Sequence, residues 1–242
     1  ILKDSHKNQG RSIDLKTKIR NLLSEYIPLW SIPPLLTIFV VNSLIYSGSS
    51  ILTANRYHYD FTTVLDRAVP VLPVFVWFYI LAFPFWAVGY VLAARRGKDM
   101  FYRFVATDLT IHFICFICFI LIPTTNIRPE IAGDTISEKL LLLVYSLDGG
   151  NSPSNLLPSI HCYVSWMCWK GVAGSEKVPN WYQIFSLIFA VLIIISTQVL
   201  TQHYLGDAVA ALILGEFLWR FYQTGQRHNW VIRLFGHRDV RQ

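Results

Sequence analysis

Charged residues are scarce in this sequence, and their scarcity excludes an ordinary soluble protein. Asp, Glu, Lys and Arg make up 15% of the 242 residues, whereas 53% of the residues are hydrophobic. In soluble globular domains roughly a quarter of the residues are charged. The sequence also has no G-x4-G-K-[ST] segment, no glycine-rich dinucleotide-binding pattern and no solenoid-type repeat. It therefore gives no indication of a nucleotide-binding or repeat protein.

Cysteine is also rare, with four residues in the chain. Cys115 and Cys118 have the C-x2-C spacing of a zinc site, but they lie in an apolar stretch. Zinc sites with this spacing are usually formed by turns in polar domains. Cys162 and Cys168 lie in a second apolar stretch. We therefore expect buried, reduced thiols rather than a metal site.

Long apolar runs are what the sequence has in abundance. Runs of about 20 residues are long enough to cross a ~30 Å hydrocarbon core as helices. The pattern predicts an all-α fold, a polytopic membrane helix bundle with about six transmembrane helices. A shorter apolar run, Leu140–Leu147, predicts a helix at the membrane interface. The expected spans are 27–47, 69–94, 104–122, 158–169 continuing toward 174, 181–200 and 204–222.

Basic residues are distributed unevenly between the two sides that these spans define. If both termini lie in the cytoplasm, all but four of the 21 Lys and Arg residues lie there too, the exceptions being Arg56, Arg67, Arg128 and Lys139. Because Lys and Arg are enriched in cytoplasmic segments, this imbalance predicts cytoplasmic termini. It also accounts for most of the net charge of +6. We expect no nucleic-acid partner, because no soluble domain bears the charge.

The same pattern divides the chain into three segments. Residues 1–26 are expected to form an amphipathic tail on the cytoplasmic leaflet, where basic residues meet anionic lipid. Residues 27–224 form the six-span membrane catalytic domain, and residues 225–242 form a basic cytoplasmic tail.

Two histidines and an aspartate are expected to meet at the outer ends of the spans. His203 and Asp207 are four residues apart and share one face of a helix. The carboxylate can then orient the imidazole and stabilise its positive charge. His161 follows Pro158-Ser159, a pair that commonly opens a helix. The predicted topology places both histidines at the same depth near the outer surface.

These residue types suit phosphoryl transfer, which needs a nucleophile, a proton donor for the leaving oxygen and positive groups around the phosphate oxygens. A neutral imidazole can attack phosphorus and form a phosphohistidine. A second histidine can protonate the leaving oxygen. The N–H groups that follow Ser159 and the guanidinium of Arg128, which lies just after the third span, could bind the phosphate oxygens.

The two motifs resemble those of a known family. Pro-Ser-x-His at 158–161, followed by Ser-x6-His-x3-Asp at 196–207, is similar to the type 2 phosphatidic acid phosphatase superfamily. This superfamily consists of integral membrane lipid phosphatases, and its fold is shared with vanadium haloperoxidases. The resemblance covers about Val69 to Tyr222. It implies a lipid phosphate substrate within the bilayer, and the predicted topology puts the active site on the extracytoplasmic side.

The resemblance also implies roles for individual residues. By position, His203 is the nucleophile, Asp207 is its partner and His161 is the general acid. Ser159 and Arg128 are implied to bind the substrate phosphate. The resemblance further implies that no metal or organic cofactor is needed.

Three positions depart from the usual pattern of the superfamily. Leu121 stands where the first motif has Lys, Ile160 where the second has Gly, and Thr197 where the third has Arg. Two of three phosphate-binding cations are therefore absent. Sphingomyelin and inositol phosphorylceramide synthases belong to the same broad group, and this chain resembles them more closely at these positions. Those enzymes rely on a His–His–Asp set to move a phosphorylated head group between lipids.

Three functional hypotheses follow. A lipid-phosphate phosphatase is the first, a phosphotransferase between lipids is the second, and a non-catalytic transporter or scaffold of the same fold is the third. The sequence does not indicate which lipid is the substrate and leaves the oligomeric state open.

Other ionisable residues are expected to have structural roles. Asp108 and His112 lie four apart in the third span, where an interhelical hydrogen bond is favoured over a proton path. Glu216, near the cytoplasmic end of the sixth span, is expected to pair with a basic neighbour. Solvated imidazoles are expected in the loops and tails, at His58, His228 and His237.

Overall fold

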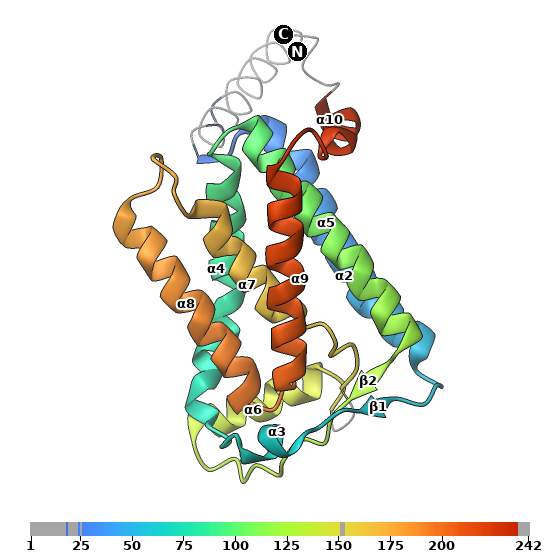
Figure 1. Cartoon of the computed structure of the whole chain (residues 1–242). Coiled ribbons are helices and arrows are strands. Elements are labelled where there is room, and N and C mark those ends of the chain that lie inside the picture. The colour runs from blue at the N-terminus through green and yellow to red at the C-terminus, as the bar shows by residue number, and fades with distance from the viewer. Residues whose placement is uncertain (1–17, 19–23, 25, 151–152, 237–242) are drawn as a thin grey trace, which may run out of the picture.

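The long helices form a bundle in which successive helices run in alternating directions (Figure 1). The computed structural model describes residues 18, 24, 26–150 and 153–236. The long helices are α2 (Ile32–Thr53), α4 (Val76–Ala94), α5 (Lys98–Leu121), α7 (Ile160–Val172), α8 (Asn180–Val199) and α9 (Leu205–Gln223). The short ones are η1 (Leu29–Ser31), α3 (Val64–Ala68), η2 (Pro73–Phe75), α6 (Ile136–Leu147) and α10 (Asn229–Phe235).

Four helices of the described chain are long and apolar enough to cross a membrane, namely Leu29–Thr53, Pro73–Ala94, Lys98–Leu121 and Asn180–Val199. Helix α7 has 13 residues, which at ~1.5 Å per residue gives about 20 Å, short of a ~30 Å core. Helix α9 has 19 residues but carries Asp207, Glu216 and Arg220. The all-helical fold is confirmed, whereas the number of spans and the side of the termini stay predictions.

Helix α7 lies at the centre of the bundle, in contact with α4, α5, α8 and α9. Its neighbours cover most of its surface, so it presents little apolar surface to lipid. The α4–α7 contact is close because it uses small residues. A Cβ added at Gly89 would lie 2.7 Å from the Cys168 side chain, and one at Gly171 would lie 2.9 Å from the Ala93 Cβ.

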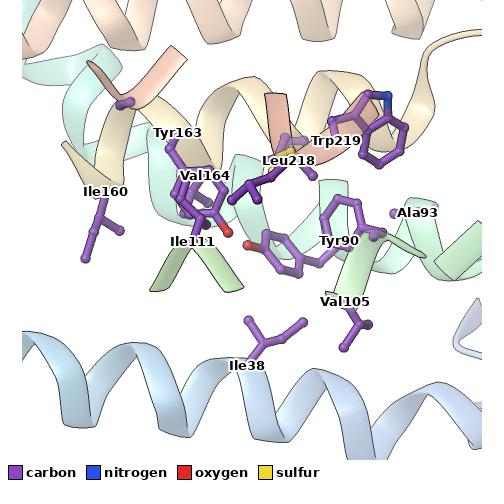
Figure 2. Close-up of a cluster of buried hydrophobic side chains, with 14 of the residues drawn as sticks. Ile38, Tyr90, Ala93, Val105, Ile111, Ile160, Tyr163, Val164, Leu218 and Trp219 are labelled. Atoms are coloured by element: carbon purple, nitrogen blue, oxygen red, sulfur yellow. The ribbon is translucent and has the colours of Figure 1, made fainter. Parts of the chain in front are cut away.

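A buried aspartate joins four of the long helices. The hydroxyls of Tyr90 on α4 and Tyr163 on α7 both donate to Asp108 Oδ1 on α5, and Figure 2 shows these two hydroxyls pointing toward each other. His112 Nδ1 lies 3.2 Å from Asp108 Oδ2, and its Nε2 lies 3.0 Å from Asn42 Oδ1 on α2. The predicted interhelical hydrogen bonding is confirmed, and it involves more helices than expected.

The four cysteines are free thiols. Their expected burial is confirmed for three of them, whereas Cys118 is half-buried. The expected pairing of Glu216 with a basic neighbour is also confirmed. Glu216 pairs with Lys170 and Arg220, each at 2.8 Å.

The expectation for His228 is wrong. Its side chain is buried, and Nε2 lies 2.8 Å from Asp99 Oδ1. The reason is that residues 229–235 form α10, which folds back against α5 instead of extending as a tail. The predicted amphipathic segment 1–26 lies mostly outside the described residues.

Short elements gather at one end of the bundle, opposite the end where α10 lies (bottom of Figure 1). Strands β1 (Tyr59–Asp60) and β2 (Thr124–Thr125) pair in parallel there, a small element that the all-α prediction did not include. Helix α6 begins at Ile136, N-capped by Thr135, and contains the predicted interfacial helix. This end of the bundle carries the candidate site.

Candidate active site

The start of α9 is anchored by contacts with distant segments. Leu205 N–H donates to Asp66 Oδ1 on α3 at 2.7 Å, so a side chain from another helix caps α9. The Tyr204 hydroxyl accepts from Phe61 N–H at 3.1 Å and lies 2.8 Å from Asp60 Oδ1 on β1. These contacts fix the residues that immediately follow His203.

The turn between α8 and α9 is tight. The Thr197 carbonyl accepts from the N–H groups of Gln202 at 2.9 Å and His203 at 3.1 Å. Thr197 itself is fully buried. The backbone of the turn therefore sets where His203 lies.

His203 is oriented through one ring nitrogen. Nδ1 lies 3.3 Å from Asp207 Oδ2 and 3.1 Å from the Leu156 carbonyl oxygen. Both partners are acceptors, which assigns the proton to Nδ1 and leaves the lone pair on Nε2. Asp207 Oδ2 also accepts from Tyr204 N–H at 3.0 Å. The predicted His–Asp pair is therefore present, but the Leu156 carbonyl shares its role.

His161 occupies the first turn of α7, beside the second histidine. The ring centroids of His161 and His203 are 5.7 Å apart, with an angle of 55° between the ring planes. His161 also stacks on Tyr79 at 4.8 Å and packs against Trp86 at 5.3 Å. A narrow crevice borders both histidines, and Asp148 forms part of its wall.

Ser159 connects the two motifs. Its Oγ accepts from Cys162 N–H at 3.3 Å and caps α7, and its side chain is fully buried. Its own N–H donates to the Asp207 carbonyl at 3.3 Å. The starts of α7 and α9 are thus joined directly by backbone, while a phosphate contact for Ser159 stays a prediction.

Arg128 lies close to His203 but is already engaged. Its Nη1 donates to the carbonyls of Tyr145 and Asp148, both at 2.9 Å. Its Nη2 donates to Asp148 Oδ2 at 2.6 Å and to Gln202 Oε1 at 2.9 Å. The guanidinium therefore joins the loop after α6 to the residue that precedes His203, and its charge is paired with Asp148.

Sequence reasoning missed Asp148. It binds Arg128 and also accepts a hydrogen bond from the Tyr46 hydroxyl on α2. Asp148 lies outside the recognised motifs, before Gly149-Gly150, so no local pattern indicated its role.

The positions of the two missing cations differ in their surroundings. Leu121, at the end of α5, is 66% exposed, whereas Thr197 is buried in the last turn of α8. A cavity of about 210 Å³ opens beside His203, with Arg128, Asn126 and Arg67 in its wall. Arg67 was placed on the outer side by the sequence, but it was not assigned to the site.

Comparison with known proteins gave one match. A family model described as the PAP2 superfamily matches residues 51–219. This range contains all five residues that the sequence assigned to the site. No curated protein and no solved structure was found to match the chain.

Proposed function

This chain belongs to the PAP2 superfamily, and from that premise we propose that it is an integral membrane lipid-phosphate phosphatase that works through a phosphohistidine. The observation that carries the proposal is the 5.7 Å separation of the His161 and His203 rings, with Asp207 bound to His203 Nδ1. One phosphoryl group that contacts the first ring can also contact the second.

In the first step, His203 Nε2 attacks the phosphorus atom of the lipid phosphate. A P–N bond forms, the P–O bond to the lipid breaks, and protonated His161 gives its proton to the leaving oxygen. The lipid alcohol departs. Asp207 stabilises the positive charge that develops on the His203 ring.

In the second step, neutral His161 removes a proton from water, and the oxygen of that water attacks the phosphohistidine. The P–N bond breaks, inorganic phosphate leaves, and His203 returns to its neutral form while His161 is protonated again. Protons and charges balance over the cycle.

We place the site at the outer face of a six-pass domain with cytoplasmic termini. The α4–α5 turn, with Arg95, Arg96 and Lys98, lies at the end of the bundle opposite α3 and α6 (Figure 1). Basic residues mark cytoplasmic segments. Helix α7 would then cross while shielded by its neighbours, and α9 would cross with one apolar face toward lipid.

A phosphotransferase is the second candidate, favoured by the surroundings of the two missing cations. Leu121 is exposed and Thr197 is buried at the end of α8, and neither side chain provides charge to a phosphate. A site with fewer fixed cations is better suited to a phosphodiester head group than to a dianionic monoester. The phosphohistidine would then be attacked by a second lipid alcohol instead of water.

Purified protein in proteoliposomes is incubated with labelled phosphatidic acid, or with a phosphodiester lipid labelled in its head-group phosphate. Each is tested with and without an alcohol acceptor that differs from the lipid alcohol of the donor, and the products separate the hypotheses. Release of free phosphate supports the phosphatase, and a newly labelled lipid supports the transferase. The absence of both products would leave a transporter or scaffold. His203→Ala should abolish turnover, whereas His58→Ala, which removes a histidine outside the site, should retain it.

A further inference from the structure

We propose that Arg67 is the second cation of the phosphate site and takes the place of the motif cations that this chain lacks. The inference rests on the proposed function and names a binding residue outside the motifs. It follows from where α3 is docked, from the state of the Arg67 guanidinium and from the charge of its neighbours.

Helix α3 is held against the start of α9. Asp66 Oδ1 accepts from Leu205 N–H at 2.7 Å, and Asp66 Oδ2 accepts from Thr63 N–H at 2.7 Å. One carboxylate therefore caps its own helix and a helix that lies 139 residues further along the chain. Arg67 is the next residue, so its backbone is placed near the two residues that follow His203.

The side chain of Arg67 borders the cavity that reaches His203. That cavity has a volume of about 210 Å³, and its wall includes Arg67, Arg128 and His203. Arg67 thus approaches the nucleophile from α3, whereas Arg128 approaches it from the loop after β2. A ligand in this cavity would lie between two guanidinium groups.

Within the part of the chain that the structure describes, the Arg67 guanidinium has a single hydrogen bond, a 3.5 Å contact from Nη2 to the Thr62 carbonyl. Arg67 is exposed, so its donors face solvent. Its charge also acts on Asp60. Burial raises the pKa of Asp60, but hydrogen bonds from Thr62 and Tyr204 and the charge of Arg67 outweigh it and bring the pKa below its usual value.

The neighbouring charges leave Arg67 as the cation with spare binding capacity. Arg128 is neutralised by Asp148 at 2.6 Å. Asp66 lines the same cavity, but its oxygens are occupied by the N–H groups of Leu205 and Thr63. Burial raises the pKa of Asp66, and these bonds outweigh it and lower the pKa overall.

The ligand chemistry that fits this arrangement is a phosphate ester at the membrane surface. A guanidinium presents a planar set of donors that matches two phosphate oxygens. Arg67 would bind the oxygens that stay on phosphorus while His203 attacks.

Inorganic phosphate is the probe for this site. Its affinity is measured from the rise in melting temperature of the full-length protein in detergent, for the wild type and three variants. Arg67→Ala should weaken phosphate binding about tenfold, equivalent to ~1.4 kcal/mol. Arg67→Lys should recover part of the affinity, because lysine restores the positive charge but not the planar set of donors of a guanidinium. Lys139→Ala removes an exposed cation on α6 that does not line the cavity, and should leave phosphate affinity unchanged.

The outcomes separate this proposal from the phosphatase assignment. Unchanged phosphate affinity in Arg67→Ala, or no phosphate binding by the wild type, overturns the Arg67 site. Arg67-dependent phosphate binding without turnover of any lipid phosphate supports the site and refutes the phosphatase. With turnover, Arg67→Ala should raise KM for the lipid phosphate, and Lys139→Ala should not.

Discussion

Replacing Asp207 with asparagine should separate the charge of this carboxylate from its hydrogen bonds. Asp207 Oδ2 accepts from Tyr204 N–H at 3.0 Å and lies 3.3 Å from His203 Nδ1. An asparagine amide oxygen in the same position can accept both bonds. The Leu156 carbonyl, 3.1 Å from Nδ1, still requires the proton to be on that nitrogen. The variant should therefore keep the fold of the site and the tautomer of His203.

The expected loss of rate follows from the strength of the bond. A hydrogen bond to a charged group contributes about 1.5–3 kcal/mol and a neutral one about 0.5–1.5 kcal/mol. Losing the charge should therefore raise the barrier by about 1–2 kcal/mol, which lowers kcat roughly 5- to 30-fold. Where an aspartate alone sets the tautomer of a catalytic histidine, the same substitution costs about 10⁴-fold. In this protein the Leu156 carbonyl also binds His203 Nδ1, so the loss of kcat should be smaller.

The assay is the initial rate of phosphate release from labelled phosphatidic acid in mixed micelles, together with the melting temperature of each variant. Asp207→Asn should melt close to the wild type. Asp134→Asn, at an exposed carboxylate of the outer segment, is the matched control and should keep the wild-type rate. A loss near 10⁴-fold with unchanged melting would show that the carboxylate sets the tautomer, and full activity would remove Asp207 from the mechanism.

Three further substitutions test other parts of the structure. His161→Ala should slow release of a lipid alcohol more than release of p-nitrophenol, because the better leaving group needs less protonation; equal losses would contradict a general acid. Asp108→Ala should lower the free energy of unfolding by about 3–5 kcal/mol, because it breaks a buried charged network; an unchanged melting temperature would refute this. Gly171→Ala should lower the free energy of unfolding by about 1–3 kcal/mol, because its Cβ would lie 2.9 Å from the Ala93 Cβ at the α4–α7 contact. Gly48→Ala is the control and should leave the melting temperature unchanged, because its Cβ would have nothing within 4 Å.

Much of the local structure could be predicted from the sequence. Apolar runs of helical length indicated the long helices, and the i, i+4 spacing put His203 and Asp207 within reach of each other. The Pro-Ser pair marked the start of α7, where Ser159 is the N-cap. These features depend on neighbouring residues. His203, however, lies in the turn before α9 and not on the same helix face as Asp207, so the close contact comes from the turn and the first turn of α9.

Features that depend on docking between distant segments were missed. His228 was expected in solvent, but α10 folds back and buries it beside Asp99. Asp148 carried no motif, yet it pairs with Arg128. Arg67 was assigned to the outer side but not to the site, because nothing near it in the sequence shows that Asp66 caps α9.

The sequence by itself determined the apolar, helical character and the superfamily, and it indicated which two histidines and which aspartate belong to the motifs, because composition, period and motif are properties of short stretches. Only the tertiary structure decided that the ring centroids of His161 and His203 lie 5.7 Å apart and that the Leu156 carbonyl helps to orient the His203 ring. It also decided that the charge of Arg128 is paired with Asp148, whereas the Arg67 guanidinium has one hydrogen bond. These contacts join residues tens of positions apart. The packing of helices sets such distances, and no local periodicity encodes them.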